Sequence, residues 1–378
     1  MRRLVHAAAL AALFSFVPAA AAQHPGPPAS APGAPPPATP PAPLASPTDA
    51  FAGQAMWIWE VAKSEGGDVE AIAERAAAAG MSYVVVKAAH GTVRWPQFGQ
   101  PLVDALHGAG LRVCAYQRAL ARRPASEARV LAGALALGAD CLVVDAEIEY
   151  QGKYWAARSY VRALRRAVGP SFPVALTSFP YVDFHGTFPY SVFLGPGGAQ
   201  VNMPQMYWRL LGTSVDRAFA RTWAQNAVYG RPLAPLGQSW RPATRGEIRR
   251  FRSLAAARGA LGLGWWVWQH ASVAHWAGMT DELPAPVQLF SAFPRFAPLR
   301  RGAAGDPVRW LQQRLRAAGS SVPVTGRFLG LTAAAVADFR ERAGLPPGET
   351  VGDAVWSALL SATPIDPPAE PLPAPPAG

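Results

Sequence analysis

Two acidic side chains stand two positions apart at the end of a short apolar run, residues 141–147, which reads CLVVDAE. If this run is a β-strand, alternation places Asp145 and Glu147 on one face, with Cβ atoms about 6.6 Å apart. Two carboxyl groups at that separation can act as a pair, one neutral acid and one ionised group. The spacing fits hydrolysis of a glycosidic bond without deciding between retaining and inverting chemistry. The alternative is a buried Asp145 that only forms an ion pair.

Polar and aromatic residues also stand near the ends of the other apolar runs. Rings can stack on the apolar faces of sugars, and amides or carboxylates can bind their hydroxyls. Lys87 has two open interpretations, a counter-charge for Asp145 or a direct contact to substrate. For the rings the alternative is packing inside the protein. The candidate substrate-binding residues are Glu60, Lys87, Gln205, Tyr207, Trp240, Trp268 and Gln269.

The elements that must position these residues alternate regularly between apolar runs and amphipathic, Ala- and Arg-rich stretches. Eight such units within residues 51–290 predict an α/β fold, a closed (β/α)₈ TIM barrel, with the chemistry at the carboxyl ends of the strands. A helix near 190–195 is only weakly indicated. The expected strands are 56–60, 83–89, 111–117, 141–147, 173–179, 201–208, 233–240 and 262–269, and the expected helices include 69–79, 98–109, 125–137, 154–168, 214–228 and 243–258.

Other classes of site find little support in the sequence. The seven His are scattered, and neither metal-ligand spacing nor a phosphate-binding glycine loop occurs, so we expect no metal and no cofactor. Cys114 and Cys141 are the only cysteines, and strand-centre positions favour two buried thiols over a disulfide.

The 378 residues carry a formal charge of +11, which favours acidic polymers or an anionic envelope as partners. No recognition motif accompanies this charge, so nucleic acid is not expected. Arg2 and Arg3, an apolar stretch and Ala20–Ala22 predict a signal peptide over 1–22, and an uncleaved short anchor is the alternative. No second segment predicts stable membrane insertion. Pro-rich stretches at 23–50 and 363–378 predict a linker and a tail.

The segment after the expected barrel has the pattern of a known binding module. It follows a short linker at 291–298 and resembles the three-helix peptidoglycan-binding domain of cell-wall hydrolases, here 299–362. This resemblance implies a small all-α domain with peptidoglycan as partner; at Arg340 the family usually has Gln. The matching residues are Leu299, Gly302, Gly305, Val308, Leu311, Gln312, Leu315, Gly319, Gly326, Phe328, Thr332, Ala335, Val336, Phe339, Gly344, Leu345, Trp356 and Leu359.

A second resemblance covers much of 56–270. The segments 83–92, 109–116, 144–147 and 265–269 follow the order seen in family-25 glycoside hydrolases, which are muramidases with a barrel fold. The resemblance implies that Glu147 is the general acid and that Asp145 orients or stabilises the reacting sugar. The family has an Asp on its first strand, where this sequence offers Glu60.

Together these observations predict an exported, monomeric envelope protein, located in the periplasm, the cell wall or the medium. Its barrel would hydrolyse peptidoglycan or a related glycan. A barrel that binds glycan without cleaving it is the alternative. A peptidase or amidase would need a metal or a nucleophile set that the sequence does not offer.

Overall fold

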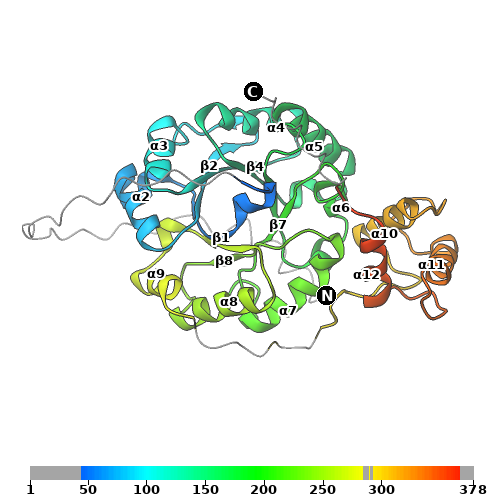
Figure 1. Cartoon of the computed structure of the whole chain (residues 1–378). Helices are drawn as coiled ribbons and strands as arrows, with labels where there is room; N and C mark the ends of the chain where they lie inside the picture. Colours follow the sequence, from blue (N-terminus) through cyan, green and yellow to red (C-terminus); the bar gives the residue numbers. More distant parts are fainter. Residues whose placement is uncertain (1–43, 284–288, 290–292, 367–378) are drawn as a thin grey trace, which may run out of the picture. The chain divides into compact units, whose positions relative to one another are not determined.

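The computed structural model describes residues 44–283, 289 and 293–366 (Figure 1). The expected signal peptide 1–22, most of the linker 23–50, part of the linker 291–298 and most of the tail 363–378 lie outside the described residues. The described chain opens with a 3₁₀ helix, Pro47–Phe51, whose N-cap Ser46 forms a capping box with Asp49. Ala50 and Phe51 are buried, so ordered packing begins just before residue 51.

Parallel strands form a ring in the order β7-β6-β5-β4-β2-β1-β9-β8 (Figure 1). Parallel bridges Asn202–Leu233 and Gln205–Leu236 join the two ends of this order. The predicted (β/α)₈ barrel is therefore confirmed. The strands are β1 Gly53–Ile58, β2 Tyr83–His90, β4 Arg112–Ala119, β5 Cys141–Ala146, β6 Val174–Ser178, β7 Val201–Pro204, β8 Leu236–Gln238 and β9 Gly262–Trp266, and β3 Val93–Arg94 pairs antiparallel with β2.

Helices follow the strands and cover the outside of the ring (Figure 1). Residues 190–195 contribute only the four residues of α6, in agreement with the weak pattern there. Short 3₁₀ helices lie between these elements: η2 Val61–Lys63, η3 Glu65–Gly67, η4 Gly133–Leu137, η5 Ile148–Tyr150, η6 Val182–His185, η7 Ala227–Tyr229 and η8 Trp268–His270. The α-helices are α2 Val69–Ala78, α3 Gln100–Gly108, α4 Pro124–Ala132, α5 Tyr154–Val168, α6 Tyr190–Phe193, α7 Val215–Asn226, α8 Arg245–Ala257 and α9 Val273–Thr280.

Strand alternation divides the buried apolar residues into two clusters. On β5, Leu142 and Val144 pack with the surrounding helices, whereas Cys141 and Val143 belong to a cluster inside the barrel. A parallel sheet that is buried on both faces needs apolar side chains at both inward- and outward-facing positions. For this reason residues 141–144 of β5 form a continuous apolar run.

The two cysteines form a disulfide inside the barrel. Cys114 of β4 and Cys141 of β5 are direct partners in the strand register, and their Cα atoms are 4.5 Å apart. The expectation of two free buried thiols is therefore wrong. The expectation placed both cysteines at strand centres, but Cys141 is the first residue of β5, and the register places both side chains opposite each other on the inner face.

Removing this disulfide should destabilise the barrel. The bridge closes a loop of 27 residues, and the loss of that constraint on the unfolded chain costs about 3 kcal/mol. We expect Cys114→Ala/Cys141→Ala to show this loss in urea unfolding of the oxidised protein. Wild-type protein measured with a thiol reductant should match the double variant. Equal stability of oxidised wild type and variant would contradict the prediction.

The C-terminal domain has three helices, α10 Asp306–Ala317, α11 Gly330–Arg342 and α12 Asp353–Ala362. Antiparallel bridges Leu299–Val351 and Ala304–Arg327 tie its loops together. The expected all-α three-helix domain is confirmed. Its buried residues include Leu311, Leu315, Val336, Phe339 and Trp356.

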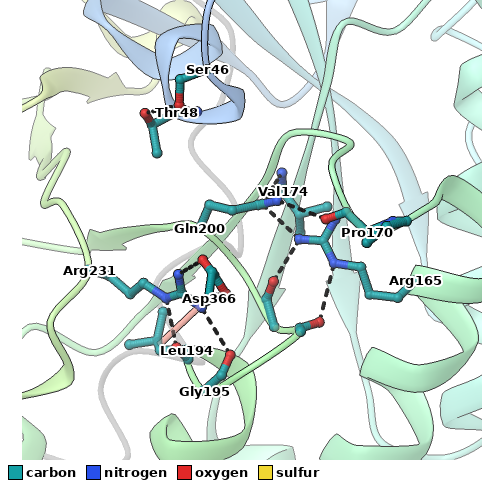
Figure 2. Close-up of polar contacts among 12 residues, drawn as sticks. Ser46, Thr48, Arg165, Pro170, Val174, Leu194, Gly195, Gln200, Arg231 and Asp366 are labelled. Atoms are coloured by element: carbon teal, nitrogen blue, oxygen red, sulfur yellow. Dashed lines mark hydrogen bonds and ion pairs between the residues drawn. The ribbon is translucent and has the colours of Figure 1, made fainter. Parts of the chain in front are cut away.

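Buried polar contacts join this domain to the barrel. The Asp306 carboxylate accepts hydrogen bonds from Ser191 N at 2.8 Å, Ser191 Oγ at 2.6 Å and Tyr229 Oη at 2.8 Å. Burial raises the pKa of Asp306 to about 6. Near the end of the described chain, Asp366 contacts Arg231, which also donates to the carbonyls of Leu194 and Gly195 (Figure 2). None of the helices described here is long and apolar enough to span a membrane.

Candidate active site

The carboxyl pair lies at the carboxyl end of β5. Asp145 shares the inward parity of Cys141 and Val143, and Glu147 follows the last strand residue, Ala146. The two side chains are 13% and 16% exposed, so both keep a small contact with solvent. Their carboxyl groups are hydrogen-bonded to each other. The structure thus brings the two acids together at the end of the barrel where such folds carry their chemistry.

One guanidinium binds both acids and a third carboxylate. Arg118 of β4 is the register partner of Asp145, and its Nη1 lies 3.3 Å from Asp145 Oδ1 and contacts Glu147 Oε1. Its Nη2 lies 3.0 and 2.9 Å from the two oxygens of Glu149. Gln205 Nε2 donates to Asp145 Oδ1 at 3.3 Å and to Glu147 Oε1 at 3.1 Å. Arg118 and Gln205 therefore each contact both carboxyl groups of the pair.

The surroundings of Asp145 favour its protonated form. Burial raises its pKa to about 8, and the charge of Glu147 and the hydrogen bond to it act in the same direction. Arg118 and Lys87 oppose the rise without cancelling it. A carboxyl group with a pKa raised by burial can keep a proton near neutral pH, as acid catalysis requires.

The raised pKa of Asp145 predicts a pH-dependent stability. Because this pKa is about 8 in the folded protein and near 3.8 when unperturbed, the folded state binds the proton more tightly. The stabilisation is complete below about pH 4 and is lost as the pH rises toward 8. Its limiting slope is about 1.4 kcal/mol per pH unit. Asp145→Asn cannot lose this proton, so its urea-unfolding free energy should fall less between pH 5 and 8. Parallel curves for both proteins would contradict the prediction.

Lys87 lies near the pair but is held by aromatic rings. Its side chain is 7% exposed, and Nζ lies 4.2 Å from the ring centroid of Trp95 and 5.7 Å from that of Trp59. Burial lowers the pKa of Lys87, and the charge of Asp145 opposes this. The ion-pair partner of Asp145 is Arg118, and the part of the chain that is described has no ion pair between Lys87 and Asp145.

Glu60 and Gln269 lie together beyond the ends of β1 and β9. Gln269 Nε2 is 3.4 Å from Glu60 Oε2, and Glu60 N donates to Gln269 Oε1 at 3.4 Å. Glu60 also forms an ion pair of 2.5 Å with Lys63. Its charge acts on Lys87 and on Tyr116, so it belongs to the same end of the barrel.

Of the expected aromatic residues, two lie near the pair. The rings of Tyr207 and Trp240 meet edge to face, with centroids 4.9 Å apart. Burial raises the pKa of Tyr207 well above its usual range, and the charges of Asp145 and Glu147 add to the rise. Tyr207 is buried and Trp240 half-buried, so Trp240 offers more of its surface to a ligand.

Trp268 is placed differently from the expectation. It is 3% exposed, packs against Trp276 and donates from Nε1 to Glu65 Oε1 at 3.0 Å. It belongs to the cluster between strands and helices, because the chain turns into η8 directly after β9. In the segment 265–268, Trp266 packs with the cluster inside the barrel. Its ring centroid lies 5.8 Å from that of Trp57 and 6.0 Å from that of Tyr116.

Two residues of the site were not among the sequence-based candidates. Arg118 directly follows the third expected strand, but only the structure shows that it is the register partner of Asp145 and also contacts Glu147 and Glu149. Gln97 follows the small hairpin formed by β2 and β3, and its Nε2 donates to the carbonyls of Lys87 and Trp59. No sequence pattern pointed to it.

Several solved structures resemble parts of this chain. The N-terminal domain of SleB is 34% identical over 18% of this chain and 92% of its own, with a TM-score of 0.17. A chitinase from Chromobacterium violaceum is 13% identical over 60% of this chain and 98% of its own, with a TM-score of 0.41. An endo-1,4-β-D-mannanase from Thermotoga petrophila is 9% identical over 57% and 88%, with a TM-score of 0.45.

Structural similarity with TM-scores and identities this low assigns no activity to the barrel, and it does not single out the family-25 muramidases. No curated protein matches the chain. Residues 304–359, which contain all of α10 and α11 and most of α12, match the family model described as "Putative peptidoglycan binding domain".

Proposed function

We propose that this chain is an exported envelope protein whose barrel hydrolyses a glycosidic bond in peptidoglycan or a related glycan. The observation that carries the proposal is the Asp145–Glu147 pair at the carboxyl end of the barrel, where Arg118 and Gln205 each contact both carboxyl groups. The family match of residues 304–359 supports a wall glycan as the substrate.

In the proposed reaction, Glu147 takes the proton of Asp145 through the hydrogen bond between them and passes it to the leaving glycosidic oxygen. The carbon–oxygen bond breaks, and Asp145, now ionised, stabilises the positive charge that develops on the sugar ring. Water adds to the anomeric carbon and returns a proton to the pair. This division of roles is the one that the resemblance to family-25 muramidases implies, with Glu60 standing where that family has an Asp on the first strand.

The surrounding residues would bind the sugar. Trp240 supplies a partly exposed ring, and Gln205, directly after β7, supplies an amide that donates to both acids. Glu60 and Gln269 extend the polar lining beyond β1 and β9. The contacts of Lys87 with the rings of Trp59 and Trp95 fix the position of its side chain.

The C-terminal domain would keep the barrel on its insoluble substrate. Tethering raises the local concentration of cleavable bonds without adding catalytic contacts. The Cys114–Cys141 disulfide supports export, because disulfides persist in oxidising compartments such as the periplasm or the extracellular medium. We propose that the protein acts as a monomer, without a cofactor, nucleic acid or membrane insertion.

A second candidate function is glycan binding without cleavage. Arg118 contacts all three carboxylates, and this arrangement also suits a site in which the acids are structural. The absence of an Asp at the end of β1 favours the same alternative.

Incubation of the full chain with purified sacculi separates the two functions. The hydrolase proposal expects the protein to sediment with the sacculi and to release new reducing ends into the supernatant. Sedimentation without reducing ends would support the second candidate and overturn the first. Activity that a chelator abolishes would instead indicate metal-dependent chemistry.

A further inference from the structure

Helices α4 and α5 pack side by side on the outside of the barrel (Figure 1). A groove is lined by residues of these two helices. Its volume is about 570 Å³. Small residues of the two helices, among them Ala125 and Ala167, leave space beneath longer side chains. We call it the arginine groove and define it by Arg129, Trp155, Arg158, Ser159, Arg162 and Arg166.

The charge of the arginine groove is uncompensated. Four of its lining residues are exposed arginines, and no acidic residue lines it. Helix α5 contains no Asp or Glu, and the single acid of α4, Glu127, is fully buried and accepts hydrogen bonds from backbone N–H groups of 120–123. Within the described chain none of the four guanidiniums forms an ion pair.

Another arginine of the same helix shows what a structural role requires. Arg165 turns inward, donates to Gln200 Oε1 at 2.7 Å and to Gly198 O at 2.6 Å, and is half-buried (Figure 2). Among the residues that the structure describes, Arg158, Arg162 and Arg166 have no such acceptors. Holding like charges together without a carboxylate partner is unfavourable for the free protein and is compensated when an anion binds.

The spacing of the groove suits a long ligand. Arg158, Arg162 and Arg166 follow one another at intervals of four residues, so they form a row along α5 with a rise of about 6 Å between neighbours. Trp155 continues the row at its N-terminal end, and 63% of it is exposed. A free indole face beside a row of guanidiniums can stack on a sugar while the arginines bind negative groups along the same chain.

We propose that the arginine groove binds an extended acidic polysaccharide, with carboxylates on the arginine row and one sugar ring on Trp155. A concave site with regularly spaced charges fits a linear polymer better than the flat surface of a bilayer. This binding is independent of the carboxyl pair at the end of β5 and does not require the barrel to cleave anything.

The test is an isothermal titration calorimetry measurement of the full chain with polygalacturonate at 150 mM NaCl. We expect Arg158→Gln/Arg162→Gln/Arg166→Gln to weaken binding by about tenfold or more. The matched control is Arg94→Gln/Arg217→Gln/Arg327→Gln, which removes the same charge from exposed arginines elsewhere and should weaken binding at most about twofold. Equal losses in both triple variants would overturn the proposal, because they would indicate attraction by net charge alone.

Trp155→Ala separates a polysaccharide from other polyanions. It should weaken binding of polygalacturonate about fivefold and leave binding of polyglutamate unchanged. Equal effects on both polymers would overturn the sugar contact. The third probe is vesicles of phosphatidylglycerol and phosphatidylcholine. The proposal is overturned if the protein binds them more tightly than polygalacturonate and Arg158→Gln/Arg162→Gln/Arg166→Gln loses that binding. The groove would then belong to a membrane surface.

Discussion

Glu147→Gln should abolish the release of reducing ends from sacculi, with a loss of about a thousandfold in rate. The substitution keeps the shape of the side chain and its contact with Gln205, but an amide cannot deliver a proton to the leaving oxygen. Sedimentation with sacculi should be unchanged, because the matched domain at 304–359 is untouched. The measurement is a reducing-end assay beside a sedimentation assay on the same samples.

The matched control for this variant is Glu74→Gln, which removes one carboxylate from the exposed face of α2. It should retain the wild-type rate. Asp145→Asn should also be strongly impaired, because the pair loses both the proton of Asp145 and the charge that would face the sugar. Full activity of Glu147→Gln would remove the basis for assigning chemistry to this pair.

Arg118→Gln should produce the largest loss of stability among the substitutions considered. It leaves Asp145, Glu147 and Glu149 without their shared cation in a site where Arg118 itself is only 18% exposed. Breaking a buried ion pair on one side costs about 3–5 kcal/mol. We expect this loss in urea unfolding at pH 8, with Arg118→Lys recovering part of it because the charge is retained.

The pH dependence distinguishes this explanation from lost packing. Without the guanidinium, the pKa of Asp145 rises further, because the positive charge that lowers it is gone. Stability should therefore be retained at low pH and lost as the pH rises, so the deficit at pH 5 should be smaller than at pH 8. Arg94→Gln, on an exposed site with no ion pair in the described chain, should change stability by less than about 0.5 kcal/mol at either pH. A deficit of Arg118→Gln that does not vary with pH would contradict the account.

The sequence was most informative where local pattern determines structure. Each expected strand overlaps an observed one, because β-branched and apolar runs bounded by polar ends specify buried parallel strands with little help from context. The same alternation placed Asp145 and Glu147 on one side of β5. The C-terminal domain followed from a helical pattern in which apolar residues such as Leu311 and Leu315 share one face.

The sequence was least informative about contacts between strands. Whether Cys114 meets Cys141, and whether Arg118 meets Asp145, depends on the register of β4 against β5, and a shift of one residue would turn either side chain to the other face. The prediction that Trp268 binds substrate fails for a related reason. The alternation of inward and outward side chains ends where η8 begins. Extending it past Trp266 therefore wrongly places Trp268 inside the barrel.

The most direct test of the central claim is mass analysis of the soluble fragments that the full chain releases from purified sacculi. Hydrolysis by the carboxyl pair predicts disaccharide-based fragments that each gain one water per bond cleaved, and these fragments should be missing from the Glu147→Gln digest. Fragments cut within the peptides, or the same fragments from both proteins, would contradict the assignment of glycosidic cleavage to Asp145 and Glu147.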